Sequence, residues 1–190
     1  MRTSLSHPLI IAELTVGDRG GAIGVTFAPG KHQQTAMTGA WSRDLHLDLE
    51  AIRQWKATSL ISLIEPWEFN ELDIEDLPAI AEAKELQWYG LPITDGAAPD
   101  QRLLAKWPAL SAAFVQDLYQ GGRLVVHCKG GLGRAGTVAA MLLLDSGASL
   151  SAAEAISRVR GVRPGAIETV EQEEFLIHWH QRLAGKGRTG

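Results

Sequence analysis

Hydrophobic residues along the chain form two kinds of pattern: short apolar runs, and longer stretches in which apolar residues recur every three or four positions. The short runs predict extended strands, and these lie at Leu9–Leu14, Ala22–Phe27, Ser59–Ile64, Gln87–Ile93 and Arg123–His127. The periodic stretches predict helices, and these lie at Asp44–Trp55, Asp76–Leu86, Asp100–Tyr119, Ala135–Leu144, Ser151–Arg160 and Thr169–Leu183. Strands that alternate with helices are typical of an α/β fold. We therefore predict one α/β domain with a central, mostly parallel sheet of four to five strands flanked by helices.

Length and composition favour one domain. The chain has 190 residues, of which 45% are hydrophobic and 21% charged, as is ordinary for a globular domain with a substantial core. No repeat and no low-complexity linker interrupts it. We expect residues 1–40 to form extended segments packed on the domain, residues 41–184 to form the domain itself, and residues 185–190 to form a flexible tail.

Charge and cysteine usage narrow the classes of function. A net charge of −4 argues against a general nucleic-acid binder, because such proteins are usually basic. No apolar run reaches the length of about 18 residues that a membrane span needs, and the N-terminal region is too acidic for a signal peptide. The only cysteine, Cys128, excludes an internal disulfide and a cysteine-cluster zinc site. The lone cysteine predicts a reducing, cytoplasmic setting, and we also expect a monomer.

One segment, 124-LVVHCKGGLGRAGTVAAML-142, concentrates the unusual residues. It contains Gly131-Leu-Gly133-Arg-Ala-Gly136, which has the spacing of a dinucleotide-binding turn. That turn needs a second strand ending in an acidic residue, whereas Ser151–Arg160 has helical spacing and opens with a capping box. The Gly-Lys-Ser/Thr of a Walker loop is also missing. The segment is therefore not predicted to bind a nucleotide cofactor.

The same segment fits a phosphate-binding nest that contains a nucleophile. The predicted strand ends at His127, and Cys128 lies between it and the helix after Arg134. Backbone N–H groups of such a turn can point into one concavity and bind a tetrahedral dianion. The predicted phosphate-binding residues are Lys129, Gly130, Gly131, Leu132, Gly133 and Arg134. Arg134 can bind two phosphate oxygens at once, and the same positive groups would stabilise a thiolate, so Cys128 is the candidate nucleophile.

His127-Cys128-Lys-Gly-Gly-Leu-Gly-Arg134 resembles the His-Cys-x5-Arg signature of the protein tyrosine and dual-specificity phosphatases. Two further segments follow the order of that superfamily. The segment 91-LPITDGAAPD-100 resembles its general-acid loop, and 163-RPGAIETVEQ-172 resembles its later segment with a glutamine. The resemblance covers roughly residues 40–182 and is strongest to the cyclin-dependent-kinase-inhibitor-3-like, or kinase-associated, phosphatases. It places a phosphatase P-loop between a strand and a helix.

The resemblance implies hydrolysis of phosphate monoesters through a cysteinyl-phosphate, with no metal and no cofactor. The implied substrates are phosphotyrosine proteins, with phosphoserine or phosphothreonine proteins as a further possibility and phosphoinositides or small phosphate esters as the alternative. Phosphate-recognition modules without turnover and rhodanese-type sulfur transferases also use such loops. An intact catalytic set argues against the former, and the latter needs neither His127 nor an Asp95 loop.

The resemblance also assigns individual roles. Asp95 is the implied general acid, since Asp100 is better suited to cap the helix that follows it. Gln172 either positions the attacking water or closes a capping box with Thr169, and the sequence does not decide between these roles. His127 supports the loop and the thiolate. Apart from the resemblance, Lys129 and Arg163 are candidates either for attracting acidic substrates or for solvated surface charges, and the sequence does not decide between these.

The sequence departs from the family at one position. The residue after the motif arginine is usually Ser or Thr, whose hydroxyl helps the thiolate leave, but here it is Ala135. Thr137 is the nearest supporting hydroxyl and lies two residues further on. We therefore expect the phospho-enzyme to break down more slowly than in the family.

Overall fold

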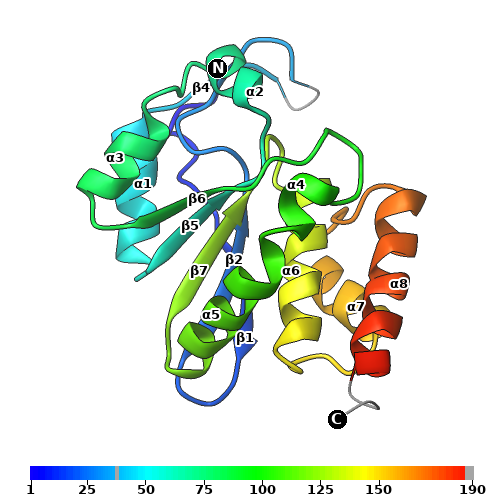
Figure 1. The fold of residues 1–190 in the computed structure, drawn as a ribbon. Coiled ribbons are helices and arrows are strands. Elements are labelled where there is room, and N and C mark those ends of the chain that lie inside the picture. Colours follow the sequence, from blue (N-terminus) through cyan, green and yellow to red (C-terminus); the bar gives the residue numbers. More distant parts are fainter. Residues whose placement is uncertain (37–38, 187–190) are drawn as a thin grey trace.

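A five-stranded sheet forms the centre of the molecule (Figure 1). The structure is a computed structural model that describes residues 1–36 and 39–186. The sheet has the order β1-β2-β7-β5-β6, with β1 at Ala12–Val16, β2 at Gly21–Thr26, β5 at Ser59–Ser62, β6 at Gln87–Gly90 and β7 at Arg123–His127. Four strands are parallel, and β1 joins the edge antiparallel to β2. The predicted mostly parallel α/β sheet is therefore confirmed.

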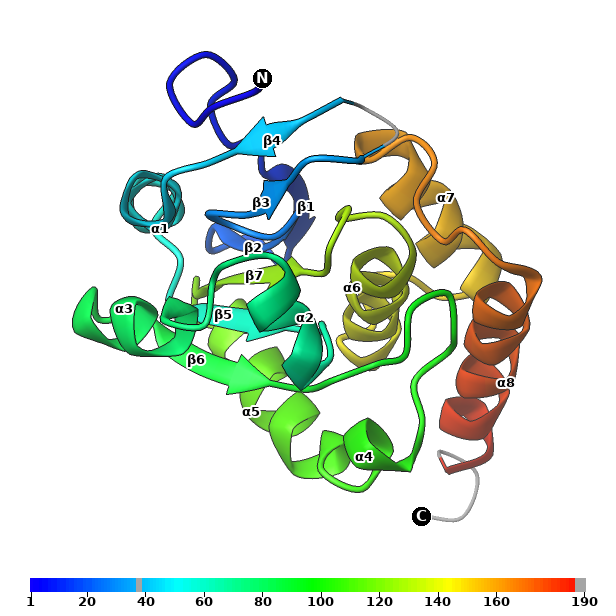
Figure 2. The same cartoon turned by 90° about the horizontal axis from the view of Figure 1, so that it is seen from above.

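Helices cover both faces of this sheet (Figure 2). On one side lie α1 and α3, and on the other lie α5 and α6, with α7 and α8 beyond α6. Their bounds are Leu45–Gln54 for α1, Leu77–Ala83 for α3, Trp107–Tyr119 for α5, Gly133–Asp145 for α6, Ala152–Val162 for α7 and Val170–Lys186 for α8. Helix α6 is buried along almost its whole length, because it lies between the sheet and the two last helices. Its first turn is therefore fixed at the edge of the sheet.

The first 40 residues contribute directly to the central sheet. Strand β2 lies between β1 and β7, so its hydrogen bonds join the N-terminal segment to the middle of the domain. A small ribbon follows, in which β3 at His32–Gln33 pairs with β4 at Trp41–Ser42. Arg2 forms a bridge to Trp41 beside this ribbon. Residues 1–40 thus supply strands to the domain rather than only lying against it.

The structure differs from the predicted helices in two places. The helix predicted over Asp100–Tyr119 is two helices, α4 at Gln101–Leu104 and α5, because Pro108 lacks an N–H and occupies the first turn of a new helix. A short helix that was not predicted, α2 at Pro66–Glu71, follows β5. It has too few residues to show a helical period. Both α2 and β4 lie at the end of the molecule where the parallel strands terminate, the top of Figure 1.

Within the described ranges 1–36 and 39–186, no helix combines the length and the apolar character that a bilayer span requires.

Candidate active site

The loop after β7 joins the carboxyl edge of the sheet to α6. Cys128 is the first residue after β7 and is 3% exposed. Gly131 has a φ of +69°, and a Cβ there would lie 2.4 Å from the backbone of Thr26 at the end of β2. Both the backbone conformation and this close approach require glycine. The loop therefore lies directly on the ends of β2 and β7, where parallel α/β sheets bind ligands.

Polar groups outside the loop hold its carbonyl oxygens. The Lys129 oxygen accepts a hydrogen bond from Lys31 Nζ at 3.2 Å. Arg163 donates to the oxygens of Gly130 and Gly131 at 3.1 and 3.0 Å. Because the carbonyl and the N–H of a peptide unit point in opposite directions, carbonyls held from outside turn N–H groups toward the inside of the loop. This arrangement supports the predicted phosphate nest of residues 129–134, and binding itself stays a prediction.

Arg134 is buried and held by a carboxylate that the sequence did not reveal. Its two terminal nitrogens donate to Glu68 at 2.6 and 2.9 Å, and both side chains are 1% exposed. One of these nitrogens also donates to the Ile93 oxygen at 3.1 Å. Burial alone would lower the pKa of Arg134, but the hydrogen bonds to Glu68 and the nearby Cys128 and Glu68 charges raise it overall. The guanidinium is therefore charged and fixed in orientation before any substrate arrives.

Asp95 lies at the mouth of the site. Its side chain is 71% exposed, and its Oδ1 is 3.3 Å from Arg134 Nη2. Asp100 instead accepts a hydrogen bond from the Arg102 N–H at 2.9 Å and is the N-cap of α4, as predicted. The structure thus brings Cys128, Arg134 and Asp95 together and places Asp100 in a helix cap.

Gln172 joins the start of α8 to the loop that carries Asp95. Its Oε1 accepts hydrogen bonds from the N–H groups of Glu168 and Thr169 at 2.9 and 3.3 Å. The Thr169 hydroxyl accepts from the Gln172 N–H at 3.2 Å, so the predicted capping box is present. The Gln172 Nε2 also donates to the Ala97 oxygen at 3.2 Å, and the Thr169 hydroxyl donates to the Gly96 oxygen at 3.0 Å. A water-positioning role for Gln172 stays a prediction.

His127 belongs to a buried chain of hydrogen bonds beneath the loop. Trp88 Nε1 donates to Ser62 Oγ at 2.9 Å, and Ser62 Oγ lies 2.6 Å from His127 Nε2. His127 Nδ1 lies 3.3 Å from the Cys128 oxygen. Complete burial lowers the pKa of His127 to about 4, so the ring is neutral at pH 7. A neutral ring that accepts from Ser62 and donates to Cys128 satisfies every partner in this chain.

The hydroxyl of Thr137 is engaged within α6. It donates to the Gly133 oxygen one turn earlier in α6, at 2.8 Å. Ala135 is fully buried and offers no polar group. The supporting role that the sequence suggested for Thr137 therefore requires this hydrogen bond to break.

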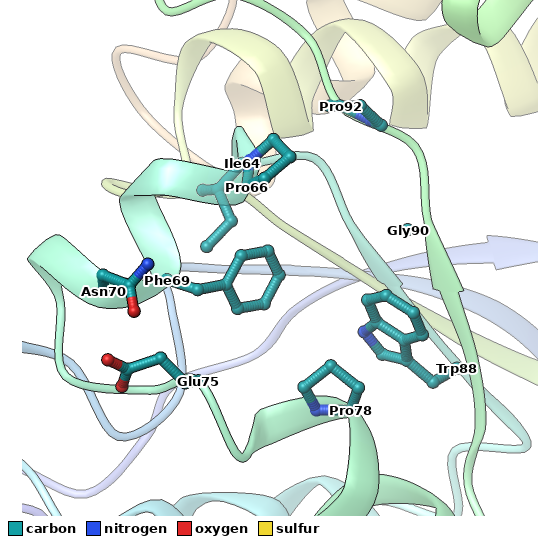
Figure 3. Close-up of a pocket in the computed structure, with 9 residues that line it drawn as sticks. All are labelled: Ile64, Pro66, Phe69, Asn70, Glu75, Pro78, Trp88, Gly90 and Pro92. Atoms are coloured by element: carbon teal, nitrogen blue, oxygen red, sulfur yellow. The ribbon is translucent and has the colours of Figure 1, made fainter.

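Two cavities border the site. A cleft of about 690 Å³ is lined by the Cys128 loop, Asp95 and residues from the N-terminal segment. A second, largely apolar cavity of about 410 Å³ lies beside α2. In this second cavity Phe69 and Trp88 approach each other edge to face, with ring centroids 6.4 Å apart (Figure 3). Helix α2 thus supplies Glu68 to the site and Phe69 to the neighbouring cavity.

Three groups at the site were missed by the sequence analysis: Glu68, Lys31 and Ser62. Each lies far from Cys128 along the chain and reaches the loop because β2 and β5 flank β7. A usable signal exists only for Glu68, which is an acidic residue soon after a buried strand at the ligand-binding edge.

Comparison with known proteins agrees with this geometry. The family model PTP-SAK, described as a Swiss Army Knife protein with a DSP-PTPase phosphatase domain, matches residues 78–176. Cyclin-dependent kinase inhibitor 3 of Rattus norvegicus is 38% identical over 104 residues, which cover 52% of this chain and 48% of the relative. Protein tyrosine phosphatase type IVA 3 of Mus musculus is 30% identical over 142 residues, which cover 73% of this chain and 74% of the relative.

A solved structure has the same fold. Kinase associated phosphatase, carrying a serine in place of its catalytic-site cysteine, superposes with a TM-score of 0.79 at 24% identity, covering 93% of this chain and 97% of that one. At this identity the likeness shows the fold alone. The match to the rat relative spans about half of that protein's length. The family model, which spans about half of this chain, and the mouse relative confirm the resemblance seen in the sequence, and the chain belongs to the DSP-PTPase family of dual-specificity and tyrosine phosphatases.

Proposed function

We propose that this chain hydrolyses phosphate monoesters on phosphotyrosine proteins through a cysteinyl-phosphate intermediate, without a metal ion. One observation carries the proposal: a single loop on the ends of β2 and β7 holds Cys128 at its start and the buried Arg134 just beyond it, with Asp95 3.3 Å from that arginine. Among the described residues, no cluster of three or more His, Cys, Asp or Glu could hold a metal ion.

In the first step the Cys128 thiolate attacks phosphorus. The new S–P bond forms as the bond from phosphorus to the ester oxygen breaks, and Asp95 in its acid form gives its proton to that oxygen. The loop N–H groups and Arg134 stabilise the charge on the phosphoryl oxygens. Because Glu68 already fixes Arg134, this stabilisation needs little rearrangement during the reaction.

In the second step the Asp95 carboxylate takes a proton from water. The water oxygen attacks phosphorus, the S–P bond breaks, and inorganic phosphate and the thiolate are released. Asp95 is suited to both steps because its exposed side chain can exchange protons with solvent and substrate.

Protein substrates are supported by the relatives, whose names are cyclin-dependent kinase inhibitor 3 and protein tyrosine phosphatase type IVA 3. Phosphoserine and phosphothreonine proteins are the extension of this proposal. A panel of phosphopeptides and soluble inositol phosphates distinguishes protein substrates from other phosphate esters, since only the former support the proposal.

The decisive test is hydrolysis of two aryl phosphates in the presence of EDTA. We expect the parent to act on p-nitrophenyl phosphate and on phenyl phosphate, and Cys128→Ser to fall to the background rate. Asp95→Asn should lower kcat by about 10²–10⁴-fold on phenyl phosphate, the poorer leaving group, and by much less on the nitrophenyl ester.

Asp100→Asn is the matched control, because it removes a carboxylate from the same segment but from a helix cap. It should leave kcat close to the parental value. Intact mass measurement of quenched reactions should show a phosphorylated parent and no such species in Cys128→Ser. Full activity in Cys128→Ser, or an inactive parent, would falsify the mechanism.

A further inference from the structure

The cleft at the Cys128 loop has a second wall built from the N-terminal segment. We call it the N-terminal wall and define it by the residues Arg2, Phe27, Lys31 and Trp41, all of which line the cleft of about 690 Å³. The loop and Asp95 line the same cleft. A phosphate held in the nest would therefore be next to this wall, and the remainder of a substrate could extend along it.

Lys31 is an unusual lysine because it is only 4% exposed. Its ammonium lies 5.0 Å from the centre of the Phe27 ring and 4.9 Å from that of Trp41. One of its three N–H groups donates a hydrogen bond to the Lys129 oxygen at 3.2 Å. Arg2 approaches the same indole, with its guanidinium carbon 5.2 Å from the ring centre. Arg43, which is paired with Asp48, also lies over this ring at 5.5 Å, so three cations share one indole in the wall of the cleft.

Neither Lys31 nor Arg2 forms an ion pair with a carboxylate among residues 1–36 and 39–186. Asp48, a buried carboxylate of α1, is bound by Arg43 at 2.7 and 2.8 Å and by the Gly30 N–H at 2.8 Å. The charged groups that act on Lys31 are the Cys128 thiolate and three further cations, Arg43, Lys129 and Arg163. Burial lowers the pKa of Lys31 to about 8, and the Cys128 charge opposes this only in part.

Lys129 and Arg163, the cations that the sequence suggested for attracting substrate, already have partners within the protein. Lys129 Nζ is 2.7 Å from Glu71, and Arg163 donates to the loop carbonyls. The Cys128 charge offsets the cost of burying the Lys31 ammonium only in part. A second negative group in the cleft would therefore stabilise this buried cation further.

We propose that Lys31 and Arg2 form a second anion-binding subsite, and that the substrate is a phosphorylated polypeptide with a second anionic group close to the scissile phosphate. The rings of Phe27 and Trp41 supply apolar contact for the peptide segment between the two charges. This inference rests on the proposed phosphatase function and specifies its substrate class. The second group is an acidic side chain or another phosphorylated residue, because both offer the oxygen acceptors that an ammonium and a guanidinium bind.

The test uses three phosphotyrosine peptides that differ at one adjacent residue, which is Ala, Glu or phosphoserine. We measure kcat/KM for each with the parent, Lys31→Met, Arg2→Met and Lys106→Met. Lys106 is an exposed lysine at the start of α5 and serves as the matched control. Kd for each peptide is measured in the same set carrying Cys128→Ser, so that the subsite is tested even if turnover is absent.

We expect the parent and the Lys106→Met control to prefer the two acidic peptides over the Ala peptide by about tenfold, as one favourable charged contact supplies. Lys31→Met should reduce this ratio to about twofold or less, with Arg2→Met between the two. Since Lys31 loses its charge around pH 8, the parental ratio should also decline between pH 7 and pH 9. The scissile phosphate is common to all three peptides, so its own titration cancels in the ratio.

The outcomes separate the two proposals. If hydrolysis is absent but the Kd ratio still depends on Lys31, the proposed function is wrong and the subsite stands. Equal use and equal binding of the three peptides by the parent overturn the subsite. So does a Lys31→Met variant that loses the same factor on every peptide, since Lys31 would then act only on the loop. A Lys31-dependent preference confined to a soluble inositol bisphosphate overturns the polypeptide substrate.

Discussion

The two carboxylates that contact Arg134 are held in opposite ways. Glu68, on α2, is 1% exposed and makes two short hydrogen bonds to the guanidinium. Asp95, on the loop before α4, is 71% exposed and makes one contact at 3.3 Å. The first geometry suits a group that fixes a charge in place, because a buried ion pair has few other arrangements. The second suits a group that must exchange a proton with substrate and solvent.

The loop of Asp95 is nevertheless anchored, although through its backbone. Gln172 and Thr169 hold the oxygens of Ala97 and Gly96 from the start of α8. The chain therefore fixes where the loop lies while leaving the Asp95 side chain at the mouth of the cleft. The position of this loop is thus set by side chains at the start of α8 and not by the Asp95 side chain itself.

Removing Glu68 should have the largest effect, because it tests the difference between the buried Glu68 and the exposed Asp95 directly. Glu68→Ala leaves the Arg134 charge buried without its partner, and we expect the free energy of unfolding to fall by about 3–5 kcal/mol. Glu68→Gln, which keeps the shape and some of the hydrogen bonds, should lose less. Urea unfolding measures the change, and kcat/KM should fall together with it because Arg134 is no longer oriented.

Glu71→Ala is the control from the same helix, since its pair with Lys129 is 46% exposed on the glutamate side. It should cost less than about 1 kcal/mol. Equal losses in the Glu68 and Glu71 variants would mean that burial of the Glu68–Arg134 pair is not what stabilises the site.

His127 tests the stability of the buried part of the site through its dependence on pH. The pKa of this buried histidine is about 4 in the folded chain, and it is 6.5 when the ring is exposed, as in the unfolded chain. From pH 6.5 down to 4 the unfolded chain binds a proton that the folded chain does not, so stability falls with pH in this window. We expect His127 to account for a loss of roughly 2 kcal/mol between pH 7 and pH 5. In His127→Asn the loss measured by urea unfolding should be smaller by that amount, and an unchanged loss contradicts the prediction.

The smallest expected effect concerns the second chemical step. Ala135→Ser places a hydroxyl one residue after Arg134, where it can donate to the departing thiolate, whereas the Thr137 hydroxyl is bound to Gly133. One such hydrogen bond should speed breakdown of the phospho-enzyme by about tenfold. Rapid-quench measurements should show a burst in the parent that shrinks in the variant. The idea fails if the parent shows no burst and turnover is the same in both proteins.

The sequence predicted the parts of this molecule that depend on neighbours in the chain. The strand before Cys128, the loop and the helix after it form one local segment. The capping box at Thr169 is local as well, and so is the N-cap at Ser151, where Glu154 bonds the Leu150 N–H instead of closing the predicted box. Pro108 is also a local signal for the break between α4 and α5, because proline favours the first turn of a helix, although the apolar pattern across it suggested one helix. The family comparison confirms the fold class, while the roles of Asp95 and Gln172 stay predictions.

The groups that hold the loop could not be predicted because they depend on sheet order. Glu68, Ser62 and Lys31 follow or end strands that are distant in sequence, and only the order β2-β7-β5 brings them to one edge. A pattern of polar and apolar residues predicts which segments are strands but not which strands become neighbours.

The pairing of β2 with β7 has a consequence for the order in which the protein matures. Ala22 of β2 is aligned with Arg123 of β7. The two strands that support the Cys128 loop can therefore pair only after about 100 intervening residues have been made. During synthesis, the first strands must wait for β7, and the anchoring contacts of Gln172 arrive later still, from α8. We expect a nascent chain to lack the complete site until α8 has left the ribosome, so a partial chain should not yet catalyse the proposed hydrolysis.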